Sequence, residues 1–254
     1  MATHEIAATH HGPAAAHAAH VPAEHSAHAA LAHHFDNLEQ QREAGSLGMW
    51  IFLAQEVMFF GGLFLAYVIY RTRFPEAFAA ASNHLNWKLG AFNTAVLICS
   101  SLTMALAVWA AQVGRTRRTQ VFFMALTGLL GATFLGVKAV EYYDKYRDHL
   151  IPVRGWFHWE QPLSANVSEQ NIQMFYWIYF AMTGLHALHM IIGIAILLPI
   201  MYRAWKGAYS PEYHAPVELF GLYWHFVDIV WIFLFPLLYL LGAHYAGGHA
   251  AAGH

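Results

Sequence analysis

The side chains best suited to chemistry are acids and histidines set inside long apolar stretches. Glu56 lies within the run 52–60 (FLAQEVMFF). A charged side chain in the middle of a membrane-spanning helix costs about 2.5–3.5 kcal/mol on insertion scales, so an acid there suggests a function by default. Glu56 is therefore either a carboxylate that exchanges protons or contacts a lipid headgroup, or a protonated or hydrogen-bonded acid that locks helix packing.

Two further pairs have the three-residue spacing that brings side chains to one face of a helix. Lys138 and Glu141 lie near the end of an apolar stretch, close enough to the interface for their charged ends to snorkel, and we expect a structural ion pair. His225 and Asp228 lie in the run 223–231 (YWHFVDIVW). An Asp–His pair along or between helices there would neutralise both partners.

Histidines could also hold haem or copper. His186 and His189 share one helix face, and Gly184 and Gly193 on the same stretch permit a close neighbouring helix. Two imidazoles on one face cannot bracket a haem, and a dioxygen-binding copper site needs three or more convergent imidazoles. A mixed-valence copper site needs a cysteine pair, whereas Cys99 is the one cysteine of the chain. We therefore expect no metal or cofactor bound by this chain, and packing or hydrogen-bonding roles for the histidines.

Five apolar segments position these residues. Hydrophobic residues make up 58% of the 254 residues and charged residues 11%, against roughly 25% charged in an average soluble domain. A bilayer core about 30 Å thick needs about 20 apolar helical residues, and backbone groups in lipid must bond within the segment. The predicted spans are 47–70, 85–111, 121–143, 174–202 and 217–243. The sequence thus predicts an all-α, polytopic membrane protein with five transmembrane helices in a bundle.

The two ends of the chain differ from this bundle. Residues 1–46 are rich in alanine and histidine and carry nine of the 19 histidines. Clustered imidazoles can bind divalent ions, but their irregular spacing favours a disordered, solvated tail with a short helix around 31–43. The predicted organisation is a tail 1–46, a transmembrane domain 47–243 and a short flexible tail 244–254. With a net charge of -2 and no basic face, we expect no nucleic-acid partner.

The orientation follows weakly from charge. Five spans place the termini on opposite sides of the membrane, and the basic residues of the connections divide evenly between the sides. The compact group Arg115, Arg117 and Arg118 in a short connection favours a cytoplasmic N-terminus.

Five motifs, in order along the chain, resemble subunit III of the haem-copper cytochrome c oxidases in its five-helix bacterial form. They are 48–52 with Glu56 and 59–60, then 93–101, 134–142, 175–189 and 223–231. The resemblance covers about residues 46–243. Two positions depart from the family pattern: Gln55 stands where a small hydroxyl residue is expected, and Lys138 stands where glutamine is frequent.

The resemblance implies a subunit without haem or copper of its own. Its partners would be the catalytic subunit I and the copper-bearing subunit II of a proton-pumping oxidase that reduces dioxygen to water, with haem and copper in those partners. It implies that the chain stabilises the catalytic subunit, supports proton uptake and binds structural phospholipid in a cleft between helix groups. It also implies the bacterial inner membrane, with the N-terminus cytoplasmic and the C-terminus periplasmic. Membership of a respiratory supercomplex stays open.

The resemblance further implies roles for individual residues, none of them catalytic. Glu56 takes the place of the family's buried acid and is the candidate for proton uptake. Arg71, at the end of the first span, matches a basic residue that can meet a lipid phosphate. The intramembrane polar network comprises Lys138, Glu141, His186, His189, Glu218, His225 and Asp228.

Three alternatives stay open. A quinol oxidase subunit III shares the architecture, and an accessory subunit of a nitric oxide reductase resembles the same family. A third alternative is an independent proton-coupled or metal-ion transporter that uses Glu56, His186 and His225 as its path. The odd number of spans and the absence of an inverted repeat count against a transporter.

Overall fold

The computed structural model describes residues 35–153, 155–161 and 167–240, and these ranges are helical apart from the connections. The chain divides into two compact units, Met1–Ala44 and Gly45–His254. The helices are α2 (Leu38–Arg73), α3 (Pro75–Asn83), α4 (Trp87–Gln112), α5 (Arg117–Arg147), α6 (Glu169–Trp205), α7 (Ala215–Phe235) and the π-helical turn η1 (Pro236–Leu240). Among the described residues, five helices are long and apolar enough to cross a membrane, with α7 and η1 forming one span, Ala215–Leu240. The predicted fold class is confirmed.

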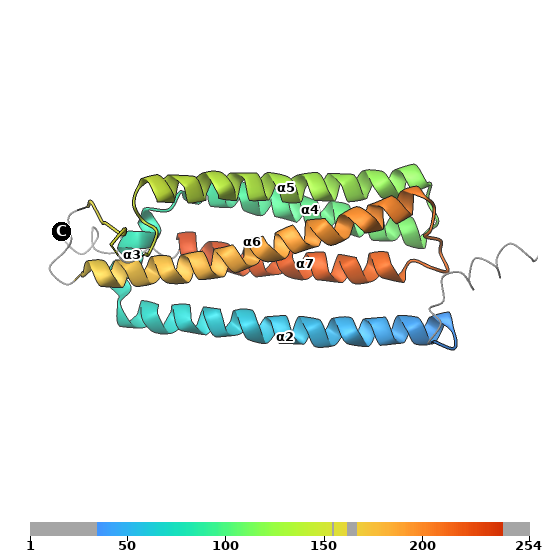
Figure 1. The fold of residues 1–254 in the computed structure, drawn as a ribbon, viewed down its shortest axis with the longest axis horizontal. Helices are drawn as coiled ribbons and strands as arrows, with labels where there is room; N and C mark the ends of the chain where they lie inside the picture. The colour runs from blue at the N-terminus through green and yellow to red at the C-terminus, as the bar shows by residue number, and fades with distance from the viewer. Residues whose placement is uncertain (1–34, 154, 162–166, 241–254) are drawn as a thin grey trace, which may run out of the picture. The chain divides into compact units, whose positions relative to one another are not determined.

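Helices α4 to α7 surround a common core. In this unit α4 neighbours α5 and α7, and α6 also neighbours α5 and α7, which closes a four-helix ring (Figure 1). Helix α2 runs beside α6 and α7 and meets them mainly through aromatic side chains, such as Phe52 on Tyr223 and Phe64 on Phe233. The Phe60 ring of α2 also lies 5.4 Å from the His189 ring of α6, so aromatic contacts join α2 to both helices.

The ends of the helices follow from local chemistry. Asn86, Thr116 and Ser168 precede α4, α5 and α6, and each side-chain oxygen accepts a backbone N–H of the first turn, which satisfies a donor that the helix itself cannot pair. Gly114 and Gly207 follow α4 and α6 with φ angles of 69° and 75°. Glycine tolerates this left-handed conformation, so the chain can turn directly after each helix.

The first helix begins earlier than the sequence predicts. Helix α2 starts at Leu38, nine residues before the predicted span at 47, and so takes in the end of the predicted tail and of the short helix predicted at 31–43. The start is capped, since the Asn37 side chain accepts from the Gln40 N–H and the Gln40 side chain accepts from the Asp36 N–H. Residues 1–34 and 241–254 lie outside the described residues, so the disorder predicted for both tails stays a prediction.

Helix α3 lies in the connection after α2 and was not predicted from the sequence. Pro75 occupies its first turn, where a missing N–H costs nothing. Its alanine-rich face buries Phe78, whose ring lies 5.4 Å from that of Phe175 in α6. The Ser82 hydroxyl donates to the carbonyl oxygen of Leu238 at 2.6 Å. The short helix thus anchors η1, at the end of the last span, to the connection after α2.

Gly131 and Gly193 make room for the Trp224 side chain in the core. Trp224 is fully buried in α7, and its Nε1–H donates to the Ser100 hydroxyl at 2.9 Å. A Cβ at Gly131 in α5 or at Gly193 in α6 would lie 2.9 Å from the Trp224 ring. The close approach predicted for Gly193 is therefore present. At Gly184 a Cβ would meet the Tyr142 hydroxyl at an ordinary 3.6 Å, so a close approach there is not needed.

We expect Gly193→Ala to lower the free energy of unfolding by about 1–3 kcal/mol, the usual cost of overpacking a core. The new methyl group would press on Trp224 and Tyr223, which are both buried. Gly136→Ala is the matched control, since its Cβ would meet nothing within 4 Å, and helix propensity should make it stabilising by up to about 1 kcal/mol. Thermal unfolding in detergent compares the two. Equal midpoints would refute the packing role of Gly193.

Candidate functional site

Glu56 connects α2 to α6. Its Oε2 lies 3.2 Å from Nε2 of His189, and both side chains are about one-tenth exposed. The Phe60 ring, one turn further along α2, lies 5.4 Å from the His189 ring and shields the pair on one side. Glu56 Oε2 has no hydrogen-bond partner among the described residues, so the two groups meet as a close polar contact. It brings the predicted buried acid together with one of the predicted histidines.

The hydrogen-bond donors and acceptors around His189 require an extra proton in this pair. Nδ1 of His189 lies 2.9 Å from the carbonyl oxygen of Leu185, which can only accept, so Nδ1 carries a hydrogen. In a neutral imidazole Nε2 would then be an acceptor facing a carboxylate oxygen, and two acceptors repel at 3.2 Å. One proton must therefore reside on either Glu56 or His189. Glu56 and His189 thus share one proton between α2 and α6.

A second polar cluster lies inside the four-helix ring. Lys138 Nζ donates to Glu141 Oε2 at 2.9 Å and to the hydroxyls of Tyr179 and Tyr239 at 3.2 and 3.0 Å. The two hydroxyls in turn donate to Glu141 Oε1 at 2.8 and 2.5 Å. The predicted Lys138–Glu141 pair is thus confirmed. The expectation that it snorkels to the interface is wrong, because the two residues are 2% and 3% exposed.

The sequence analysis did not assign the two tyrosines to this cluster. A buried tyrosine hydroxyl usually needs a hydrogen-bond partner. Tyr179 and Tyr239 are therefore candidate hydrogen-bond partners for a buried charged side chain on a neighbouring helix. Spacing along the chain could not find them, since Tyr239 stands 101 positions from Lys138. Their hydroxyls provide further hydrogen bonds to the Lys138 ammonium and the Glu141 carboxylate, which explains how both charges are accommodated while buried.

The other predicted network members do not join these clusters. His225 does not pair with Asp228; instead its Nδ1 lies 2.6 Å from the Ser101 hydroxyl of α4. Asp228 is 2% exposed, and neither of its carboxylate oxygens has a hydrogen-bond partner among the described residues. His186 is fully buried with its ring against those of Phe134 and Trp231. The expected Asp–His pair is wrong, because Ser101 lies within reach of His225.

Two more predicted residues lie toward the surface. The carboxylate of Glu218 lies 3.7 Å from His214, one turn before it, and the Glu218 side chain is 44% exposed. Arg71 donates to the Tyr67 hydroxyl at 3.1 Å, and that hydroxyl donates to the carbonyl oxygen of Leu237. Arg71 therefore connects the end of α2 to η1, and its role toward a lipid phosphate stays a prediction.

A polar hollow of about 310 Å³ leads from the surface to Glu141. Its lining includes His84, Lys145 and Asp148. Lys145 donates to the His84 carbonyl oxygen at 3.1 Å, and His84 Nε2 lies 3.8 Å from an Asp148 oxygen. Burial, followed by the nearby Lys145 ammonium, lowers the pKa of His84, and Asp148 opposes that shift. Within residues 35–153, 155–161 and 167–240, no three histidine, cysteine or acidic side chains gather as a metal site.

The lowered pKa of His84 predicts a loss of stability in acid. Below pH about 6.5 the unfolded chain protonates this histidine before the folded chain does, so stability falls as the pH drops toward the folded-state pKa. We expect the unfolding midpoint of the parent to fall between pH 7.5 and 5.5, and to fall less in His84→Gln. His158→Gln, which removes an exposed imidazole, is the control. An equal fall in both variants would contradict the assignment.

Comparison with known proteins gives one consistent family. The family model described as cytochrome c oxidase subunit III matches residues 165–243. A protein of Synechocystis sp. named cytochrome c oxidase subunit 3 is 34% identical over 195 residues, which cover 76% of this chain and 74% of the relative. The protein of that name from Corynebacterium diphtheriae is 33% identical over 77% of this chain and 87% of its own.

Relatives with a second name also match most of this chain. The quinol oxidase subunit 3 of Bacillus subtilis is 30% identical over 208 residues, 81% of this chain and 92% of the relative. The chain therefore belongs to the cytochrome c oxidase subunit III family and is a multi-pass membrane subunit of a haem-copper oxidase complex.

Proposed function

We propose that this chain is the redox-inactive subunit III of a proton-pumping cytochrome c oxidase, which reduces dioxygen to water in aerobic respiration. It stabilises the catalytic subunit I, which works with a copper-bearing subunit II, and the haem and copper reside in those partners. It lies in the bacterial inner membrane with the N-terminus cytoplasmic and the C-terminus periplasmic, and it binds structural phospholipid. The relatives named after cytochrome c oxidase, at 34% and 33% identity, support cytochrome c as the donor.

The observation that carries this proposal is the pair of Glu56 and His189. Besides stabilising the catalytic subunit, a redox-inactive subunit can support proton pumping through groups that hold and pass protons near it. The pair shares one proton, and we propose that this proton exchanges during turnover. The pair lies between α2 and α6, outside the four-helix ring. At that position a proton could exchange with groups outside this chain. Its role is therefore to feed or buffer proton uptake.

A mild-detergent purification through a tag on this chain tests the proposal. We expect haem absorption and copper to accompany the complex and to be absent from the chain when it is purified alone. The complex should oxidise reduced cytochrome c. Oxidation of quinol with no activity toward cytochrome c would favour the quinol oxidase alternative, whose relative is 30% identical. Stoichiometric haem or metal on the isolated chain would refute a redox-inactive subunit.

A further inference from the structure

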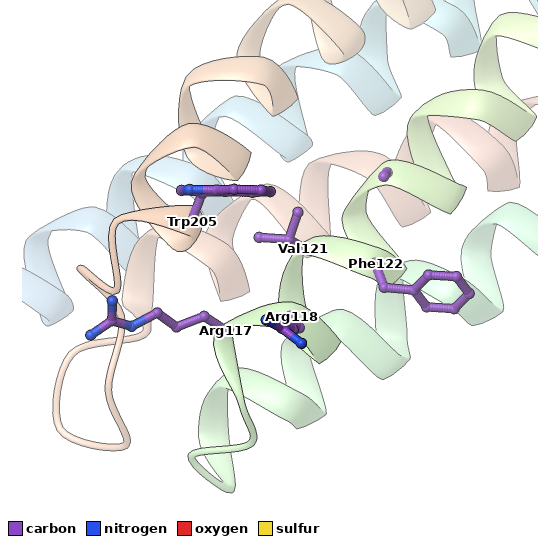
Figure 2. Close-up of a pocket in the computed structure, with 6 residues that line it drawn as sticks. Arg117, Arg118, Val121, Phe122 and Trp205 are labelled. Carbon is purple, nitrogen blue, oxygen red and sulfur yellow. The ribbon is translucent and has the colours of Figure 1, made fainter.

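An apolar hollow lies between the start of α5 and the end of α6. Its volume is about 580 Å³, and it is lined by Arg117, Arg118, Val121, Phe122, Ala125 and Trp205. Figure 2 shows the Trp205 indole facing Val121, with Arg117 extended toward the chain that follows α6. Phe122 and Trp205 are 61% and 71% exposed. Exposed apolar side chains are common along the membrane-spanning helices, and this group differs in that two arginines border it, which indicates an amphipathic ligand.

A second hollow of about 780 Å³ shares both arginines with the first. Its remaining lining comes from the connections after α4 and α6 and from the first turn of α5: Gly114, Arg115, Thr116, Gln120, Gly207, Tyr209, Ser210 and Pro211. Arg117 and Arg118 therefore stand at the border between an apolar groove along the helices and a basic, polar hollow beyond the helix ends. This arrangement matches the two halves of a phospholipid.

The positive charge of the site is not neutralised within the described residues. None of the ion pairs there involves Arg115, Arg117 or Arg118, and no acid lines either hollow. Arg115 lies over the Trp109 ring at 5.2 Å. The missing side chain of Gly207 leaves room for the Arg117 guanidinium, which a Cβ there would strike. The fold thus holds three cations around one hollow and leaves their counter-charge to a ligand.

The depth of the site also fits a lipid headgroup. Arg117 is the first residue of α5 and Trp205 the last residue of α6, so both stand where a span leaves the membrane. Tryptophan is favoured at the level of the headgroups, and the guanidinium fork matches the oxygen atoms of a phosphate. Arg71 stands at the opposite end of the spans, since successive helices reverse direction, so this site is separate from the one predicted there.

We propose that the two hollows together bind one anionic phospholipid. Its phosphodiester lies on Arg117 and Arg118, its headgroup faces Arg115, and an acyl chain runs along Val121, Phe122 and Ala125. The site rests on the lipid binding of the proposed function and names where one lipid lies, and it depends neither on the electron donor nor on the Glu56–His189 pair. Its success or failure is therefore distinguishable from that of the proposed function.

Native mass spectrometry of the full chain, purified in mild detergent with its accompanying subunits, counts bound phosphatidylglycerol during a titration. We expect Arg117→Gln with Arg118→Gln to weaken binding at least about tenfold. Arg73→Gln with Arg147→Gln removes the same charge at the opposite helix ends and is the matched control, with binding expected to be unchanged. Equal binding by both double variants would overturn the proposal.

A second variant and two competitors identify the ligand class. Ala125→Trp fills the apolar groove and keeps the arginines, and Ala125 is exposed, so the fold should tolerate it. We expect this variant to lose phosphatidylglycerol, and phosphatidylcholine to compete poorly in the parent. Displacement of the lipid by inorganic phosphate alone would show a free-anion site and overturn the proposal. So would a neighbouring subunit found to cover the groove with no lipid retained.

Discussion

Lys138→Met is expected to lower the free energy of unfolding by about 3–5 kcal/mol, because it leaves the Glu141 carboxylate buried without its cation. Glu141 would keep only the hydroxyls of Tyr179 and Tyr239 as partners. Glu141→Gln should cost a similar amount, since it leaves the Lys138 ammonium among phenol groups and aromatic rings. Unfolding midpoints in mixed micelles measure both effects.

The double variant separates an unpaired charge from lost packing. Lys138→Met with Glu141→Gln removes both charges and keeps the volume, and replacement of a buried ion pair by neutral groups is often close to neutral. We therefore expect the double variant to be more stable than either single variant. Lys206→Met, at an exposed lysine over the Tyr202 ring, is the control and should change stability by less than about 0.5 kcal/mol. Additive losses in the double variant would contradict a coupled pair.

This cluster shows what spacing can and cannot predict. The three-residue separation of Lys138 and Glu141 correctly predicts their pairing, because side chains at that spacing meet on one face of a helix. The depth of the pair depends on which helices cover that face. The hydroxyl of Tyr239 reaches the cluster from the π-helical turn after α7. No local signal in the sequence indicates that contact.

The pair of His225 and Asp228 shows the opposite case. The same spacing predicts that they share a face, yet His225 lies 2.6 Å from Ser101 on α4 instead. A helix face is a local property, whereas the choice of partner depends on packing between helices. The five spans could be predicted from the sequence, whereas α3 could not. Length and hydropathy identify a membrane-crossing helix, while nine residues buried against other helices carry no such pattern.

Glu56→Gln is expected to leave the assembled complex intact and to shorten its active lifetime during turnover about fivefold. The sequence predicted an acid of uncertain role, and the fold supplies its partner, His189. A glutamine amide can donate to Nε2 of His189, so the contact and the packing beside Phe60 persist. The amide cannot exchange a proton at the pH of the cell. That factor corresponds to a change of about 1 kcal/mol in the free-energy barrier to inactivation.

Glu218→Gln is the control that matches this change most closely. It also replaces a glutamate beside a histidine, His214, but this pair is separated by 3.7 Å and the carboxylate is 44% exposed. Proton uptake kinetics and activity decay during turnover, measured on all three complexes, separate the two roles of Glu56. Slower uptake in Glu56→Gln with normal behaviour in Glu218→Gln supports proton exchange. Unchanged uptake and decay in Glu56→Gln would leave Glu56 with a packing role alone, because the variant keeps the shape and the contact but removes the exchangeable proton.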